Sequence, residues 1–227
     1  MPDSANRERY RYSSTAATAT PGDAHPRAAR LQGEEREIAI LFADLRSFTQ
    51  FSEKKLPYDV VFVLNRYFAN MGEAVETAGG HLDKFIGDGV MALFGIEGDA
   101  ASACRQSLAA AKAMGVALAE LNRTLENDLD EPFRMGIGIY AGPAIVGEMG
   151  YGAATGITAI GDAVNTASRL ETMTKEFGAQ LVVSQDVAER AGVDLSDYPR
   201  HEIEVRGREE PIAVRVVEMV ERLTIQD

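Results

Sequence analysis

Two aspartates stand where a carboxylate is unusual. Asp44 directly follows the apolar run Ile38 to Ala43, where a charge is costly to bury without a partner. Asp88 lies between two glycines at the tip of a predicted hairpin. A single aspartate at a strand end usually caps the next turn. Two that converge at one edge of a sheet can instead hold hard divalent cations that also bind a triphosphate.

Three further polar residues could contact an anionic ligand. Asn165 and Arg169 are four residues apart on a helix predicted to begin at Asp162, so both project from one face near its positive N-terminal end. Arg169 could hold a phosphate oxygen, although an ordinary polar helix face explains the pair equally well. Lys84 lies four residues before Asp88, and by spacing alone it is more typical of a surface lysine.

The elements that must position these residues follow from apolar periodicity and turn residues. Helices are predicted over residues 57–78, 99–127 and 162–177, and strands over 36–44, 81–86, 90–94, 133–140, 180–183, 201–205 and 212–218. The expected apolar face of the first helix is marked by Val60, Val61, Leu64, Phe68 and Met71. The order strand, helix, hairpin, helix, strand predicts a ferredoxin-like α+β sandwich, with helices packed on one face of a mainly antiparallel sheet.

Composition limits the domain count and the partners. The chain has 227 residues, 45% of them hydrophobic, which suits one domain, and the Ser-, Thr-, Ala- and Pro-rich residues 1–33 are expected to be a flexible linker before a folded domain over 34–227. A formal net charge of -12 argues against nucleic acid and anionic membrane as partners. The single cysteine, Cys104, allows no intramolecular disulfide, and no apolar run reaches the length of a membrane span, so a cytoplasmic location is expected.

Three segments, read together, resemble the class III adenylyl and guanylyl cyclase catalytic domain over roughly residues 36 to 220. They are residues 42–49 (FADLRSFT), 83–95 (DKFIGDGVMALFG) and 160–171 (IGDAVNTASRLE), in the family's order and spacing. The resemblance implies that residues 34–227 form a cyclase catalytic domain. It also implies that Asp44 and Asp88 bind two Mg²⁺ or Mn²⁺ ions.

The remaining roles are also implied by the resemblance. Asn165 matches the residue that orients the ribose, and Arg169 the one that stabilises phosphate charge in the transition state. Lys84 and Thr158 match the pair that reads the base, and a lysine donor with a threonine acceptor complements adenine and so ATP. Arg206 is the best match for a triphosphate contact, with Arg208 as the alternative.

In such enzymes the site lies between two catalytic domains. Because this chain carries both sets of residues, the resemblance implies a homodimer with two shared active sites that converts ATP to cyclic AMP and pyrophosphate. The N-terminal segment is consistent with a regulatory or membrane-attached domain upstream. A guanylate cyclase and a catalytically silent nucleotide-binding domain remain as alternatives; a diguanylate cyclase or polymerase-like palm does not explain Asn165 and Arg169.

Overall fold

The computed structural model describes residues 33–152, 155–205 and 210–225. The chain divides into two compact units, Met1–Arg30 and Leu31–Asp227, and all described residues belong to the second. The predicted linker, residues 1–33, therefore falls almost wholly outside the description.

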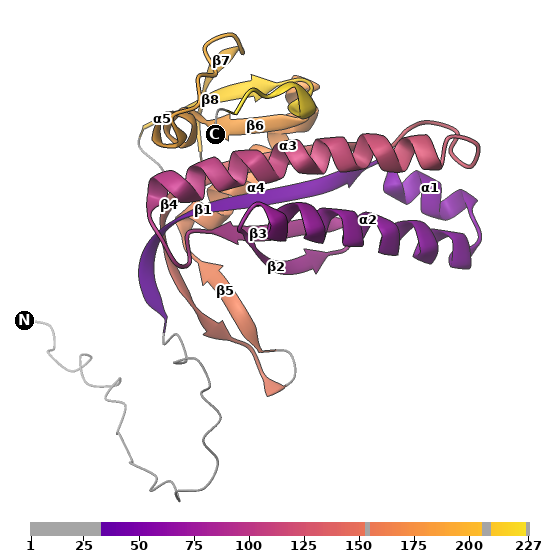
Figure 1. The fold of residues 1–227 in the computed structure, drawn as a ribbon, viewed down its shortest axis with the longest axis horizontal. Coiled ribbons are helices and arrows are strands. Elements are labelled where there is room, and N and C mark those ends of the chain that lie inside the picture. Colours follow the sequence, from indigo (N-terminus) through magenta and orange to yellow (C-terminus); the bar gives the residue numbers. More distant parts are fainter. Residues whose placement is uncertain (1–32, 153–154, 206–209, 226–227) are drawn as a thin grey trace, which may run out of the picture. The chain divides into compact units, whose positions relative to one another are not determined.

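A single sheet organises the described residues (Figure 1). Its strands are β1 (Glu34–Arg46), β2 (His81–Ile86), β3 (Gly89–Phe94), β4 (Arg134–Met149), β5 (Gly156–Ile160), β6 (Leu181–Ser184), β7 (Arg200–Ile203) and β8 (Ile212–Val217). They lie in the order β2-β3-β1-β4-β6-β8-β7, with β5 paired to β4. Among these pairings β4–β6 is parallel and the others are antiparallel, which confirms the predicted α+β class.

Helices cover both faces of this sheet, where the sequence predicted one. Alternate residues of β1 point to opposite faces. Leu41 packs in the core beneath α2 (Pro57–Thr77), α3 (Ala100–Thr124) and α5 (Gln185–Ala191), whereas Ile40 packs with Ala163 and Ala167 of α4 (Asp162–Phe177). Apolar periodicity shows that a helix has a buried side, but not which sheet face receives it.

Close packing of α4 on the sheet depends on glycine in β4. A Cβ at Gly138 would lie 2.1 Å from the backbone nitrogen of Glu171, and one at Gly136 would lie 2.1 Å from the Thr174 hydroxyl oxygen. A side chain at either position would push the helix away from the sheet. The two glycines thus set how near the polar residues of α4 come to Asp44 on the neighbouring β1.

The helix α2 begins at Pro57, as predicted, and its expected apolar face is confirmed in part: Met71 is buried, and Leu64 and Phe68 pack against the core. Pro at the first helical position has no amide hydrogen to leave unpaired. The structure buries Val63, Tyr67 and Met71, and leaves Val61 57% exposed. The N-terminal part of α2 therefore presents an apolar side chain to solvent.

Three further features were not anticipated. The strand β4 was expected to end at residue 140 but continues to Met149, where it pairs with β5 to form a two-stranded arm that projects from the sheet (Figure 1). The short helices α1 (Phe48–Lys54) and α5 are too brief to show a clear period. A turn of 3₁₀ helix, η2 (Val220–Arg222), lies near the C-terminus.

Candidate active site

The structure brings the two predicted metal-binding aspartates together. Asp44 lies near the end of β1, and Asp88 lies in the turn between β2 and β3, which begins at Gly87 with a left-handed φ of 63°. A Cβ at Gly89 would lie 3.4 Å from Asp44 Oδ1 and 3.3 Å from the Ala43 carbonyl oxygen, so the turn lies directly against β1. A hollow of about 150 Å³ opens beside Asp44 and is also lined by Ile86 and Glu171.

Negative charge accumulates at this corner. Burial raises the pKa of Asp44, and repulsion from Asp88 raises it further, while Lys175, with its Nζ 3.9 Å from Asp44 Oδ2, opposes the shift. Burial and then the charge of Asp44 also raise the pKa of Glu171, whose Oε1 is buried with no hydrogen-bond partner in the described residues. The corner therefore has more carboxylate charge than its own cations balance.

This arrangement fits a pair of hard divalent cations. In the part of the chain that the structure describes, no cluster of three or more His, Cys, Asp or Glu residues forms a complete metal site. Magnesium is commonly held by one or two carboxylates, with substrate phosphates and water as the other ligands. Asp44 and Asp88 would hold the ions from the protein side.

Tyr67 of α2 lies close to this corner and was not predicted as a site residue. Its side chain is buried and its hydroxyl has no hydrogen-bond partner among the described residues. Burial raises its pKa, and the charges of Asp44, Asp88 and Glu171 raise it further. Its position in an apolar helix repeat marks it as a core residue, so the sequence carries no signal for a site role.

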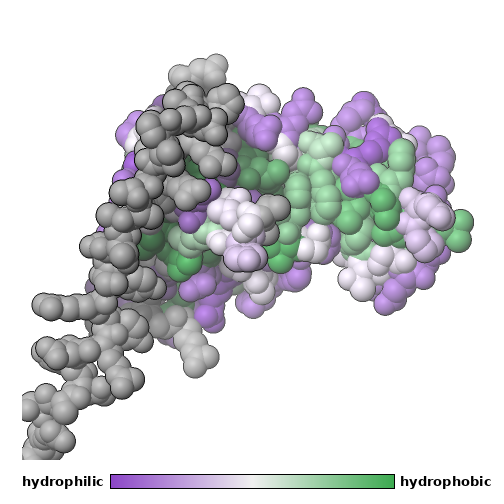
Figure 2. All heavy atoms as spheres, turned by 90° about the horizontal axis from the view of Figure 1, so that it is seen from below, coloured by the Kyte–Doolittle hydropathy of each residue, from purple (hydrophilic) through white to green (hydrophobic). Residues whose placement is uncertain are grey.

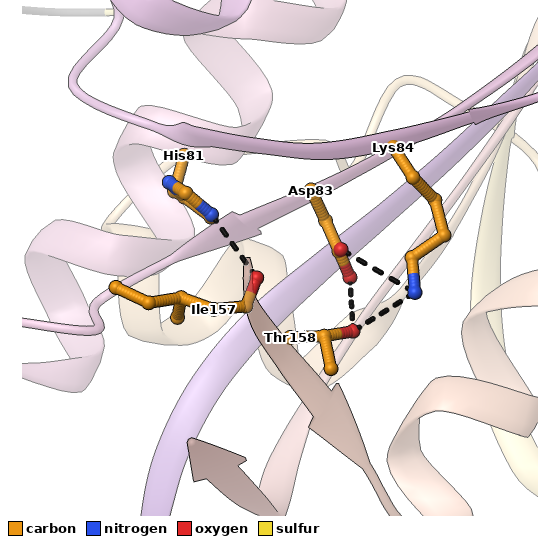
Figure 3. A network of polar contacts seen from close by, with 5 residues as sticks. All are labelled: His81, Asp83, Lys84, Ile157 and Thr158. Carbon is orange, nitrogen blue, oxygen red and sulfur yellow. Dashed lines mark hydrogen bonds and ion pairs between the residues drawn. The ribbon is translucent and has the colours of Figure 1, made fainter. Parts of the chain in front are cut away.

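The predicted base-reading pair is also in contact. Lys84 on β2 donates a hydrogen bond from Nζ to the Thr158 hydroxyl on β5, at 3.1 Å (Figure 3). The Thr158 hydroxyl in turn donates to Asp83 Oδ2 at 2.5 Å, and the imidazole Nε2 of His81 lies 3.2 Å from the Ile157 carbonyl oxygen (Figure 3). These contacts hold β2 against the β4–β5 arm, although the two residues that meet are 74 positions apart.

Asn165 and Arg169 lie on the exposed side of α4. Both side chains are exposed, and neither makes a hydrogen bond or an ion pair with another described residue. The structure shows no contact between them and either Asp44 or Asp88. The remaining predicted residue, Arg206, and its alternative, Arg208, lie outside the described residues.

A basic pocket at the end of β1 was missed by the sequence analysis. Its volume is about 290 Å³, and it is lined by Arg46, Lys54, Lys55 and Arg134, with two acids, Asp130 and Glu131, also in its wall. Its residues come from β1, α1, β4 and the segment before β4, so no single motif reveals it.

Arg46 is a partly buried cation in the wall of this pocket. Burial lowers its pKa, Glu171 opposes that shift, and Arg134 adds to it. An arginine remains protonated in proteins, and Arg46 Nη2 donates a hydrogen bond to the Ala179 carbonyl oxygen at 2.6 Å. Ser47, which follows it, is the one non-glycine residue in the described ranges with a positive φ, 65°.

Comparisons with known proteins identify the class. The family model of the adenylate and guanylate cyclase catalytic domain matches residues 32–218. The chain is 37% identical over 186 residues to an adenylate cyclase of Anabaena cylindrica, which covers 79% of this chain and 36% of the relative. It is 33% identical over 194 residues to the terminal-differentiation-specific adenylate cyclase of Dictyostelium discoideum, covering 82% of this chain and 9% of the relative.

Solved structures agree with the sequence matches. The guanylyl cyclase Cya2 superposes with a TM-score of 0.73 at 32% identity, covering 86% of this chain and 99% of that one. The adenylyl cyclase CyaB from P. aeruginosa superposes with a TM-score of 0.71 at 26% identity, covering 82% and 96%. The chain therefore belongs to the class III nucleotidyl cyclase catalytic domain family. It spans about a third or less of the length of the curated relatives named above.

No described helix combines the length and the apolarity needed to cross a bilayer.

Proposed function

We propose that this chain is an adenylate cyclase that converts ATP to 3′,5′-cyclic AMP and pyrophosphate at sites shared between two copies. The observation that carries the choice of ATP is the contact between Lys84 and Thr158. Their two groups, an ammonium donor and a hydroxyl acceptor, complement the N1 acceptor and the 6-amino donor of adenine. Guanine presents the opposite pattern at the same two positions.

In the proposed reaction the ribose 3′-oxygen forms a bond to the α-phosphorus and loses its proton, while the bond from that phosphorus to the β-phosphate oxygen breaks. Asp44 and Asp88 would hold two Mg²⁺ or Mn²⁺ ions, which when bound activate the 3′-hydroxyl and neutralise the leaving pyrophosphate. Asn165 would orient the ribose, and Arg169 would donate to the phosphate oxygens as their charge grows.

The triphosphate is expected to lie toward the basic pocket. Arg46, two residues after Asp44 on β1, and Arg134 line that pocket, and guanidinium groups bind phosphate oxygens through paired hydrogen bonds. Arg206 is retained as a further proposed triphosphate contact. The overall net charge of -12 makes such a local cluster necessary for binding a polyanion.

Exposed apolar residues support assembly from two copies. One group is at the start of α2, where Tyr58 is 89% exposed and Phe62 57% exposed, and another is on the β4–β5 arm, where Ile160 is 59% exposed. Figure 2 shows apolar surface gathered on the side of the domain seen from below Figure 1. Apolar patches of this kind commonly mark protein interfaces. Asn165 and Arg169, exposed and unpartnered among the described residues, fit a role at the partner's aspartates.

A guanylate cyclase is the second candidate, because the guanylyl cyclase Cya2 is among the similar structures at 32% identity. The contact between Lys84 and Thr158 favours ATP over this alternative.

The direct test incubates the purified chain with ATP or GTP, with Mn²⁺ or Mg²⁺, and measures both cyclic nucleotides by chromatography. The expected result is metal-dependent formation of cyclic AMP from ATP, with little cyclic GMP formed from GTP. Dominant cyclic GMP formation would support the second candidate, and no product with either nucleotide would point to a silent domain.

A further inference from the structure

A β-bulge in β2 controls which side chains reach Thr158. The pairing with β3 runs from Leu82 opposite Ala92 directly to Lys84 opposite Met91, so Asp83 is an extra residue. Neighbouring side chains in a regular strand point to opposite faces, and a bulge changes this alternation. As a result the side chains of both Asp83 and Lys84 reach Thr158 (Figure 3).

The Asp83 carboxylate is buried but its charge is paired. Its side chain is only 3% exposed, against 47% for Lys84. Oδ2 accepts the Thr158 hydroxyl hydrogen at 2.5 Å, and Oδ1 lies 3.4 Å from Lys84 Nζ. Lys84 Nζ also donates to the Thr158 oxygen at 3.1 Å, so the three groups form a closed triangle (Figure 3).

This triangle leaves few hydrogen-bonding groups for a ligand. A hydroxyl has one hydrogen and two lone pairs. In Thr158 the hydrogen goes to Asp83 and one lone pair accepts from Lys84, so one acceptor site remains. The ammonium of Lys84 has three hydrogens, of which one is donated to Thr158; its contact with Asp83 at 3.4 Å is an ion pair, so donor capacity remains for a ligand.

We infer that Asp83 is a positioning residue that commits the Thr158 hydroxyl to act as an acceptor toward the base, and thereby selects a purine with an amino group at position 6. Without Asp83 the hydroxyl is free to rotate and donate to a carbonyl at that position. The inference rests on the proposed function, in which Lys84 and Thr158 read the base. Asp83 would act through Lys84 and Thr158, which it contacts, and not by touching the nucleotide itself.

The test compares ATP with ITP, because hypoxanthine differs from adenine in having a carbonyl at position 6 and a hydrogen on N1. The ratio of kcat/KM for ATP to that for ITP is measured for the wild type, Asp83→Ala and Asp83→Asn. Asp83→Ala is expected to lower the ratio about tenfold, as for loss of one discriminating polar contact. The ratio for Asp83→Asn is expected to lie between those of the wild type and Asp83→Ala, because the asparagine amide oxygen can still accept a hydrogen bond from Thr158.

A matched pair in a Thr158→Val background shows whether Asp83 acts through the hydroxyl. Once the hydroxyl is gone, Asp83→Ala is expected to leave the ATP to ITP ratio unchanged, which is non-additive behaviour. If Asp83→Ala instead lowers kcat/KM equally for both nucleotides, Asp83 has only a structural role and the inference is wrong. Circular dichroism and Tm establish that each variant is folded. If Asp83→Ala does not fold, the same comparison is made with Asp83→Asn.

Binding separates this inference from the proposed function. The dissociation constants of α,β-methylene ATP and of the corresponding inosine analogue, measured by calorimetry with Mg²⁺, should show the same change in ratio. If the wild type forms no cyclic nucleotide, the proposed function fails while this ratio still tests Asp83. If the wild type is active and neither ratio changes, the inference about Asp83 fails alone.

Discussion

Asp83 and Asp88 belong to one hairpin, but their surroundings differ in charge. Asp83 is 3% exposed and contacts both Lys84 and the Thr158 hydroxyl. Asp88 lies in the turn opposite Asp44, where burial and then the charge of Asp88 raise the pKa of Asp44, and the Lys175 ammonium of α4 is 3.9 Å from Asp44. A buried charge is stable when it is paired, whereas two like charges held together either raise a pKa or are neutralised by a cation from outside.

The difference separates a region that the chain completes from one that it does not. The triangle of Asp83, Lys84 and Thr158 balances its charges within one chain, so it can be preformed before a nucleotide binds. The corner of Asp44 and Asp88 has surplus negative charge, and the polar residues Asn165 and Arg169 face solvent. In the proposed function, metal ions balance this surplus charge, and a second copy of the chain brings its own Asn165 and Arg169 to the site.

Breaking the metal corner is expected to have the largest effect on activity. Asp44→Asn and Asp88→Asn each remove a proposed metal ligand while keeping the shape of the side chain. Cyclic AMP formation should fall by more than about a hundredfold. Mutation of residues that merely orient metal ligands already lowers metal affinity or activity by about 10–100-fold. The exposed Glu97→Gln is the matched control and should retain activity; wild-type rates in either aspartate variant would contradict the metal assignment.

Mixing two inactive variants tests whether the exposed residues complete the partner's site. Asp44→Ala and Arg169→Ala homodimers should both be nearly inactive. In a mixed dimer one site combines both substitutions and the other has neither, so random co-expression should restore up to about a quarter of wild-type activity. Dilution should reduce this activity as dimers dissociate. Heterodimers that form but restore nothing would place the whole site within one chain.

Changing the base-reading pair should have a smaller and more selective effect. In the variant Lys84→Glu with Thr158→Cys the groups facing adenine become mismatched, at a cost of about 1–3 kcal/mol. Use of ATP should therefore fall by about tenfold to a hundredfold relative to GTP. Lys112→Glu on α3 supplies the same charge change outside the site. Full retention of ATP preference would mean that Lys84 and Thr158 do not read the base.

Stability should respond in opposite directions at the two carboxylate regions. Asp83→Asn weakens a buried, charge-assisted contact and should lower the free energy of unfolding by about 1–3 kcal/mol, which lowers Tm by several degrees. Asp44→Asn, measured with a chelator present, removes repulsion and should leave Tm unchanged or raised. Equal losses in the two variants would show that the aspartates have similar surroundings.

The pH dependence follows from the sign of the Asp44 shift. Its folded pKa lies above its unfolded value, so the folded state binds more protons and stability falls as pH rises from about 4 through the folded pKa. Glu171 shifts in the same direction. In a chelator, Asp44→Asn should flatten this part of the curve of unfolding free energy against pH, and a curve with the wild-type slope would contradict the assignment.

The sequence alone determined the class of fold and the identity of most candidate residues. The apolar run before Asp44, the glycines around Asp88 and the helix that begins at Asp162 are local signals, because a strand end, a tight turn and a helix start each depend on a few adjacent residues. The family resemblance added the roles of Lys84 and Thr158, whose contact the structure shows.

Only the tertiary structure decided features that depend on distant segments. The basic pocket joins Arg46 to Arg134, the closed triangle joins Asp83 to Thr158, and Tyr67 lies near Asp44 from another element. The register shift at Asp83 and the placement of α4 on the second sheet face arise from pairing and close packing, which leave no local period to read. Burial and charge at Asp44, which set its raised pKa, likewise exist only when these elements are folded together.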